Sequence, residues 1–331
     1  MNTILILIDS TNVPWLSKEQ QQQYQHKIEQ IAPDMQAVFM PKEKLTKEDI
    51  RDAQVIMGWS GLAKEVCEET DTPLRWVQSW SAGVDKMPMQ LFAQKKVILT
   101  SASGIHSNQL SETILGLMLG LSRGFGIAAK GQAQHKWLHN QGSSYALGEV
   151  HEKTVGILGA GKMGSVLAGL CKAFDCTVLG LSRSGGVKLG FDVVYKEEDM
   201  DGLLAKADYV VNLLPLTAQT RGIINAQKFA AMKKGAYYLG VGRGPTTNTA
   251  DLAEALSNGQ LAGAGLDVTD PEPLPEESPL WDMPNVIILP HMGGFSARYT
   301  QRLMDLFIEN LQSYVKTGKP ARNIIDFKQQ Y

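Results

Sequence analysis

The sequence has few of the features that direct a protein to nucleic acid or to a membrane. Its 32 lysine and arginine residues are balanced by 34 aspartate and glutamate residues, so there is no excess positive charge to attract a phosphate backbone or anionic lipid. No apolar run approaches the ~20 residues that a helix needs to cross a bilayer. The opening segment lacks the basic start and the small-residue cleavage site of a secretory signal. We therefore expect no nucleic-acid partner, no membrane contact and a cytoplasmic location.

Cysteine is equally scarce. The chain has only Cys67, Cys171 and Cys176, and their spacing matches neither a zinc site nor a redox pair. An odd number of thiols without a disulfide framework is typical of a reducing compartment. The pattern predicts reduced cysteines in a cytoplasmic protein, and no metal site.

Length and hydrophobic pattern predict two α/β domains. A chain of 331 residues is longer than one hydrophobic core usually supports. In the first hundred residues, short apolar segments alternate with segments of helical length, which indicates βαβ units and a parallel sheet. The expected strands are 4–8, 38–40, 55–57, 76–78 and 97–100.

A different pattern begins near residue 107. Residues 107–125 are apolar on most faces, which predicts a long helix buried between domains or in a subunit interface. A second alternation of strand and helix starts at Lys153. The last helix, about 296–317, is followed by Gly318 and Pro320, a common helix stop. Its place after the final strand suggests that the chain returns to the first domain.

A dinucleotide-binding pattern follows the first strand of this second series. Gly159, Gly161 and Gly164 stand between a predicted strand and a predicted helix, together with Lys162 and Met163. The first glycine permits a tight turn, the second lets the backbone approach a pyrophosphate, and the third allows close helix–strand packing. The helix N-terminus would direct free N–H groups at the phosphates. An ordinary turn between strand and helix is the alternative interpretation.

The end of the next strand indicates which nucleotide is bound. NAD-binding domains usually place a carboxylate there, on the ribose 2′-hydroxyl. Here Ser182, Arg183 and Ser184 occupy that region, with no acidic residue among them. A guanidinium can stack on adenine and pair with a 2′-phosphate, and the two hydroxyls add donors. We expect NADP(H) to be preferred, and NAD(H) stays open because Arg183 could equally be an exposed loop residue.

Three short segments farther along the chain supply the groups that reduction of a 2-oxo acid needs. Arg243 lies in VGRGP, Glu272 in DPEP and His291 in LPHMGG. A guanidinium can hold a carboxylate, an imidazole can donate a proton to a carbonyl oxygen, and a carboxylate can orient the imidazole. Singly, each segment is more often a surface turn, a solvated loop or a strand end. Together, behind a nucleotide loop, they indicate an oxidoreductase.

Seven ordered segments resemble the D-isomer-specific 2-hydroxyacid dehydrogenases, a family with glyoxylate/hydroxypyruvate reductase and phosphoglycerate dehydrogenase branches. They are SAGVD at 81–85, SNQLSE at 107–112, KTVGILGAGKMG at 153–164, LLPLTAQTRGII at 213–224, VGRG at 241–244, GLDVTDPEPL at 265–274 and LPHMGG at 289–294. The resemblance implies a Rossmann dinucleotide-binding domain, residues 103–291, inserted into a discontinuous flavodoxin-like substrate domain, residues 1–102 and 292–331. It also implies an active site in the cleft between them.

The resemblance assigns roles residue by residue. Arg243 corresponds to the substrate-binding arginine, His291 to the catalytic acid/base and Glu272 to the carboxylate that holds the histidine. The remaining correspondences are Ala82 and Gly83 in the loop that receives the substrate carboxylate, and Pro215, Thr220, Val241 and Asp267 beside the cofactor. Gly240 is a departure, because the family often has asparagine there.

These observations predict an NADPH-preferring reductase that forms an (R)-2-hydroxy acid from a small 2-oxo acid. Glyoxylate and hydroxypyruvate are the leading candidates, and a phosphoglycerate or a longer 2-oxo acid stays open. The resemblance implies a homodimer built on the helix near 108–125. The alternative function is a dinucleotide-sensing interaction protein similar to a transcriptional corepressor, since one fold can serve both. The complete trio favours the enzyme.

Overall fold

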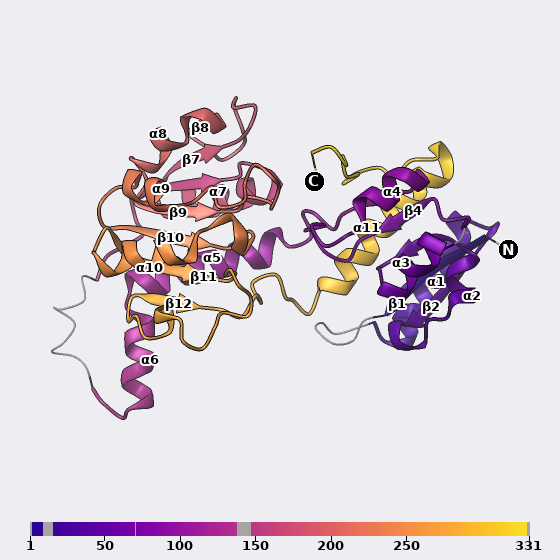
Figure 1. The fold of residues 1–331 in the computed structure, drawn as a ribbon, viewed down its shortest axis with the longest axis horizontal. Helices are drawn as coiled ribbons and strands as arrows, with labels where there is room; N and C mark the ends of the chain where they lie inside the picture. Colours follow the sequence, from indigo (N-terminus) through magenta and orange to yellow (C-terminus); the bar gives the residue numbers. More distant parts are fainter. Residues whose placement is uncertain (1, 9–15, 70, 138–146, 330–331) are drawn as a thin grey trace. The chain divides into compact units, whose positions relative to one another are not determined.

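The computed structural model describes residues 2–8, 16–69, 71–137 and 147–329. The chain forms two compact units. Unit 1 consists of Met1–His106 and Phe295–Tyr331, and unit 2 consists of Ser107–Gly294. Each unit has its own parallel sheet with helices on both faces (Figure 1), so the chain has the predicted α/β class.

Unit 1 is built on five parallel strands in the order β2-β1-β3-β4-β5, which is the flavodoxin-like order. The strands are β1 (Asn2–Ile8), β2 (Met35–Pro41), β3 (Ala53–Met57), β4 (Trp76–Gln78) and β5 (Ile98–Thr100). The helices are α1 (Lys18–Ile31), α2 (Lys47–Arg51), α3 (Gly61–Glu69), α4 (Met89–Lys95) and α11 (Tyr299–Thr317). Because α11 packs against α1, a segment from the end of the chain completes this unit.

Both faces of the unit 1 sheet are buried. In β1, Ile4 and Ile6 belong to a core completed by α1 and α11, whereas Leu5 and Leu7 belong to one completed by α3 and α4. Successive side chains of a strand point to opposite faces, and all four are at most 2% exposed. The uninterrupted apolar run of β1 is therefore the pattern expected of a strand covered on both sides.

Unit 2 is built on seven parallel strands in the order β12-β11-β10-β9-β6-β7-β8. The strand order reverses between β6 and β9, and doubly wound sheets bind ligands at this switch point. The strands are β6 (Thr154–Leu158), β7 (Thr177–Leu181), β8 (Val193–Tyr195), β9 (Tyr209–Asn212), β10 (Ala236–Gly240), β11 (Leu261–Leu266) and β12 (Val286–Ile288). The helices are α5 (Ser107–Ser122), α6 (Phe125–Ala133), α7 (Lys162–Lys172), α8 (Met200–Leu204), α9 (Ala226–Ala231) and α10 (Thr249–Ser257).

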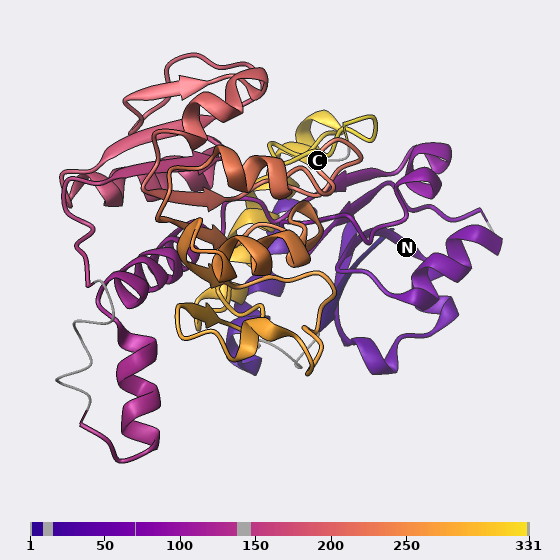
Figure 2. The ribbon, with the colours of Figure 1, turned by 60° about the vertical axis from the view of Figure 1, so that its left-hand side comes forward.

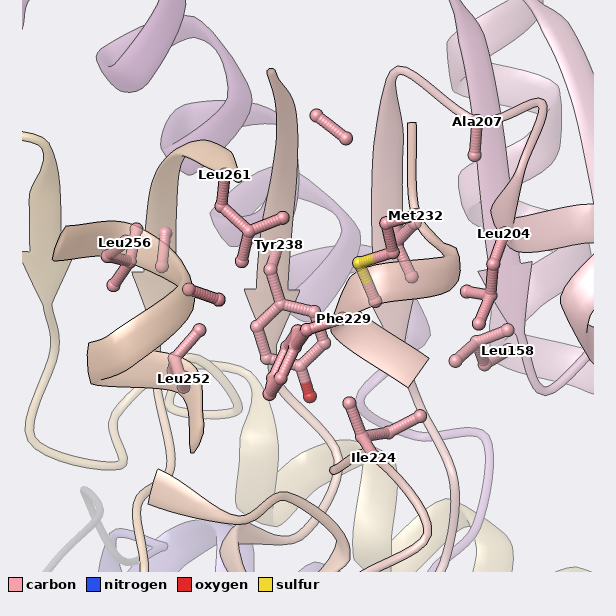
Figure 3. Close-up of a cluster of buried hydrophobic side chains, with 14 of the residues drawn as sticks. Leu158, Leu204, Ala207, Ile224, Phe229, Met232, Tyr238, Leu252, Leu256 and Leu261 are labelled. Atoms are coloured by element: carbon pink, nitrogen blue, oxygen red, sulfur yellow. The ribbon is translucent and has the colours of Figure 1, made fainter. Parts of the chain in front are cut away.

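One hydrophobic cluster of unit 2 holds α8, α9 and α10 against the sheet (Figure 3). Phe229 of α9 packs edge-on against Tyr238 of β10, with ring centroids 5.4 Å apart. Leu252 and Leu256 of α10 extend the same cluster. This packing fixes the helices that flank the loops at the carboxyl ends of the strands.

The helix predicted over 107–125 is confirmed as α5, but it ends earlier than predicted, at Ser122. The segment forms α5 and then α6, and Gly124 between them has a φ of +69°. This left-handed conformation interrupts helical hydrogen bonding and suits glycine. As a result α6 extends away from the rest of unit 2 in both views (Figures 1 and 2). Among the described residues, none of the helices has the length and apolar content that spanning a bilayer requires.

Candidate active site

The predicted site residues of unit 2 follow the carboxyl ends of its strands. The strands are parallel, so these ends share one edge of the sheet. The residues are Gly159, Gly161, Lys162, Met163 and Gly164 after β6, Ser182, Arg183 and Ser184 after β7, Pro215 and Thr220 after β9, Val241 and Arg243 after β10, Asp267 and Glu272 after β11, and His291 after β12.

The glycines after β6 have the backbone geometry of a phosphate-binding turn. Gly159 has a φ of +116°, a conformation that L side chains rarely adopt. A Cβ on Gly164 would collide with the carbonyl oxygen of Gly159, so glycine is needed for this approach of α7 to β6. A Cβ on Gly161 would meet no described atom within 4 Å, and no described side chain caps the start of α7. An anionic group therefore fits the N-terminus of α7.

The segment after β7 forms a tight turn. The Gly185 N–H donates to the Ser182 carbonyl at 3.3 Å, and Gly185 has a φ of +61°. The Ser182 hydroxyl lies 3.4 Å from the Gly185 carbonyl, and the Ser182 N–H donates to the Tyr195 carbonyl of β8 at 3.0 Å. Arg183 and Ser184 are exposed at the tip of this turn. The turn therefore presents the Arg183 cation and the Ser184 hydroxyl at the position where a carboxylate would favour NAD.

Arg243 precedes a short 3-10 helix, η4 (Gly244–Thr246), and its backbone is fixed from two sides. The Arg243 carbonyl accepts a hydrogen bond from the Thr246 hydroxyl at 2.7 Å. A Cβ on Gly244 would collide with the backbone of Thr269, so the turn packs directly on the loop after β11. The Arg243 Nη1 donates to the Gly242 carbonyl at 2.8 Å.

A buried polar network that the sequence pattern did not predict supports η4. Asn212 is 1% exposed, and its Nδ2 lies 2.9 Å from both the Tyr238 hydroxyl and the Thr246 hydroxyl. The hydroxyls of Tyr238 and Thr247 are 2.5 Å apart. Burial raises the pKa of Tyr238 to about 12, so the phenol stays neutral. A polar residue at the end of an otherwise apolar strand was the signal that could have identified Asn212.

Asp267 holds the backbone that carries His291. The carboxylate is 3% exposed, and its Oδ1 accepts hydrogen bonds from the N–H groups of Met292 at 2.8 Å and Gly293 at 2.9 Å. The His291 N–H donates to the Asp267 carbonyl at 2.9 Å. His291 has a φ of +51°, which is unusual for a residue other than glycine. Three hydrogen bonds to one residue maintain that conformation.

Glu272 and His291 meet across the ends of neighbouring strands. The Glu272 Oε1 lies 2.5 Å from the His291 Nδ1. Both side chains are partly exposed in unit 2, 42% for Glu272 and 47% for His291. The contact places Nδ1 toward the carboxylate and makes Nε2 the ring nitrogen that can face another molecule. A carboxylate in this position orients the ring and fixes which nitrogen it holds.

Thr220 and Val241 are both buried, but for different structural reasons. The Thr220 hydroxyl donates to the Pro215 carbonyl at 2.6 Å and accepts from the Thr217 N–H at 2.8 Å. These bonds give the loop after β9 a defined shape. Val241 is 3% exposed, and its N–H donates to the Asn212 carbonyl at 3.2 Å. Thr220 therefore shapes the loop with its hydroxyl rather than presenting it outward.

In unit 1, Ala82 and Gly83 lie in the loop after β4. The Ser81 carbonyl accepts from the Ala102 N–H at 3.0 Å, which ties this loop to the segment after β5. The Ser81 N–H donates to the Ser79 hydroxyl at 3.1 Å. Within the described residues, the N–H groups of Ala82 and Gly83 have no hydrogen-bond acceptor. They retain the capacity to bind an anion.

Comparison with known proteins decides the family. Residues 115–293 match the family model described as D-isomer specific 2-hydroxyacid dehydrogenase, NAD binding domain, which is more than half of the chain. The chain belongs to the D-isomer-specific 2-hydroxyacid dehydrogenases. It is therefore an NAD(P)-dependent oxidoreductase of the class that acts on CH–OH groups, and the predicted family, fold class and enzyme class are confirmed.

Individual relatives agree with this family assignment. Glyoxylate/hydroxypyruvate reductase B of Salmonella schwarzengrund (strain CVM19633) is 32% identical over 275 residues, which are 83% of this chain and 85% of the relative. A family protein from Aeromonas salmonicida subsp. salmonicida A449 superposes with a TM-score of 0.81 at 31% identity, covering 99% of this chain and all of that one. A dehydrogenase from Xanthobacter autotrophicus Py2, solved with NADPH and MES, has a TM-score of 0.79 at 26% identity over the whole of both chains.

Proposed function

We propose that this dehydrogenase is an NADPH-preferring reductase of a small 2-oxo acid, with glyoxylate or hydroxypyruvate as the substrate. The observation that carries the proposal is the 2.5 Å contact between Glu272 Oε1 and His291 Nδ1. It lies on the sheet edge that also carries the glycine turn and Arg243. Hydroxypyruvate would give the (R)-2-hydroxy acid, as the family resemblance implies, and glyoxylate would give achiral glycolate. We propose unit 2 as the dinucleotide-binding domain.

The proposed chemistry assigns one task to each side chain. Bound NADPH supplies the hydride that reduces the C2 carbonyl. His291 donates a proton from Nε2 to the carbonyl oxygen, since its Nδ1 faces Glu272. Glu272 holds Nδ1 and keeps the ring oriented for that transfer. Arg243 binds the substrate carboxylate through its planar guanidinium.

The cofactor preference follows from the segment after β7. Ser182, Arg183 and Ser184 offer a cation and two hydroxyls, without a carboxylate to bind the 2′-hydroxyl of NAD. The Xanthobacter relative, which is 26% identical, was solved with NADPH, which supports the same preference. Lys162, Met163, Pro215, Val241 and Asp267 are proposed as further cofactor contacts.

The substrate proposal draws on the Salmonella relative, a glyoxylate/hydroxypyruvate reductase that is 32% identical. We propose that the N–H groups of Ala82 and Gly83 bind the substrate carboxylate. A homodimer that uses the α5 region and a cytoplasmic location are also proposed. The buried, unpaired state of all three cysteines agrees with a reducing compartment.

A panel of 2-oxo acids assayed with both NADPH and NADH tests the proposal. We expect NADPH oxidation with glyoxylate or hydroxypyruvate, and a kcat/KM for NADH lower by about tenfold or more. The variant His291→Ala should lose about 10²–10⁴-fold in kcat while its NADPH affinity stays near wild type. Arg243→Ala should raise KM and lower kcat together. Tight NADPH binding without turnover on any acid would instead favour the dinucleotide-sensing alternative.

A further inference from the structure

We infer that Lys196 is a further specificity-determining residue, one that binds the 2′-phosphate of the cofactor beside Arg183. The inference rests on the NADPH preference proposed above. Lys196 directly follows β8, the edge strand next to β7. The hydrogen bond from the Ser182 N–H to the Tyr195 carbonyl, 3.0 Å long, brings this end of β8 beside the turn that carries Arg183.

The Lys196 side chain lies against that turn. An ideal Cβ on Gly185 would lie 3.0 Å from the Cγ of Lys196 and 3.9 Å from its Cε. The methylene groups of the lysine therefore cover Gly185, while the side chain as a whole stays 56% exposed. Gly185 has a φ of +61°, so the backbone favours glycine here, and that glycine leaves room for the lysine stem.

Lys196 forms a weak ion pair with Glu198 in the structure. Its Nζ lies 3.7 Å from the Glu198 Oε1, and the two side chains are 56% and 74% exposed. An exposed ion pair of this length contributes little, because water screens it and both side chains lose freedom. A 2′-phosphate offers more charge and several acceptor oxygens, so we expect it to displace Glu198 from the ammonium.

The other carboxylates nearby do not prevent this exchange. Asp192 is held by the Lys172 Nζ at 2.5 Å and by the Val178 N–H at 2.6 Å, near the start of β7 and away from Ser182. Glu197 and Asp199 belong to an exposed 3-10 helix, η3 (Glu197–Asp199), where solvent screens their repulsion. Lys206 supplies a matched control, because its Nζ donates to the Tyr195 hydroxyl at 2.9 Å.

Calorimetric titration of the full chain with adenosine 2′,5′-bisphosphate and with 5′-AMP tests the inference without any substrate. Lys196→Met should weaken binding of the bisphosphate by about tenfold and leave 5′-AMP binding unchanged. Lys196→Arg should retain the bisphosphate affinity, and Glu198→Gln should raise it by about twofold. Lys206→Met removes a neighbouring positive charge and should leave both affinities unchanged.

The possible outcomes distinguish a failure of this inference from a failure of the NADPH preference on which it rests. If the wild-type protein prefers the bisphosphate and Lys196→Met keeps that preference, Lys196 has no part in recognition and the inference is overturned. An equal loss in Lys206→Met would also overturn it, because the effect would then be general electrostatics. If the wild-type protein does not distinguish the two nucleotides, the proposed NADPH preference fails first.

Discussion

Removal of the Asp267 carboxylate should impair the proposed acid/base residue, His291, without changing that residue. Asp267→Ala deletes the acceptor of two backbone hydrogen bonds, from Met292 and Gly293, at 2.8 Å and 2.9 Å. Hydrogen bonds to a charged group contribute ~1.5–3 kcal/mol each. Gly293 is buried and cannot recover its bond from water, whereas Met292 is 47% exposed and can. We therefore expect a loss of ~2–4 kcal/mol in the free energy of unfolding.

The same variant should lose more activity than stability alone explains. His291 keeps a φ of +51° only while the backbone around it is held, so release of residues 292 and 293 lets the ring move. A misplacement of about 1 Å can cost about 10²-fold in rate, and we expect a kcat loss of that order. Asp267→Asn keeps a carbonyl acceptor in place and should lose less than Asp267→Ala in both stability and kcat.

Urea unfolding and steady-state kinetics measure the two effects, and calorimetry reports NADPH affinity. An Asp267→Ala variant with a kcat within twofold of wild type would refute the positioning role. A loss confined to NADPH affinity, with unchanged stability, would show that Asp267 acts on the cofactor instead.

Three other predictions concern the glycine turn and two titrating groups. Gly164→Ala should lower the free energy of unfolding by ~1–3 kcal/mol, because its Cβ meets the Gly159 carbonyl. Gly161→Ala should keep the melting temperature and weaken NADPH binding. If the two variants had the same melting temperature and the same NADPH affinity, this distinction would be contradicted. Burial raises the pKa of Tyr238 from 10.0 to about 12. The contribution of the neutral phenol to stability is therefore complete below pH 10, and the free energy of unfolding should fall by ~3 kcal/mol between pH 10 and 12. Urea titrations of Tyr238→Phe should show a shallower fall, and a curve parallel to that of the wild type would contradict this prediction. The hydrogen bond from Lys172 lowers the pKa of Asp192 below its ordinary value of 3.8, so this pair stabilises the fold at neutral pH and loses that effect as acid protonates the carboxylate. Asp192→Asn should be less stable than wild type by ~1 kcal/mol at pH 7, and urea titrations should show this gap narrowing as the pH falls below 3.8. A gap that does not change with pH would contradict this prediction.

Features that depend on nearby residues could be predicted from the sequence. The glycine turn follows from short-range sterics, because Gly159 and Gly164 are close in the chain and in space. The end of the last helix is equally local, and Gly318 adopts the expected left-handed conformation with a φ of +74°. Both are backbone requirements that few other residues satisfy.

Features set by contacts between distant segments could not be predicted. β8 escaped prediction because its three residues carry too short a pattern, and it is defined by pairing with β7. Asp267 lies 25 residues before Met292, and only the adjacency of β11 and β12 brings them together. The sequence predicts a cofactor contact for Asp267, and the structure adds a second role, as an anchor for the loop that follows His291.

The same parallel pairing explains why residues scattered along the sequence can form one site. β10, β11 and β12 are consecutive in the chain and adjacent in the sheet, so their carboxyl ends bring Arg243, Glu272 and His291 to a common edge. The exact geometry then depends on buried polar groups that the catalytic pattern does not contain. Asn212 stabilises the turn after Arg243, and Asp267 stabilises the loop of His291. Substitution of either supporting residue should therefore alter turnover while every proposed catalytic side chain remains in the protein.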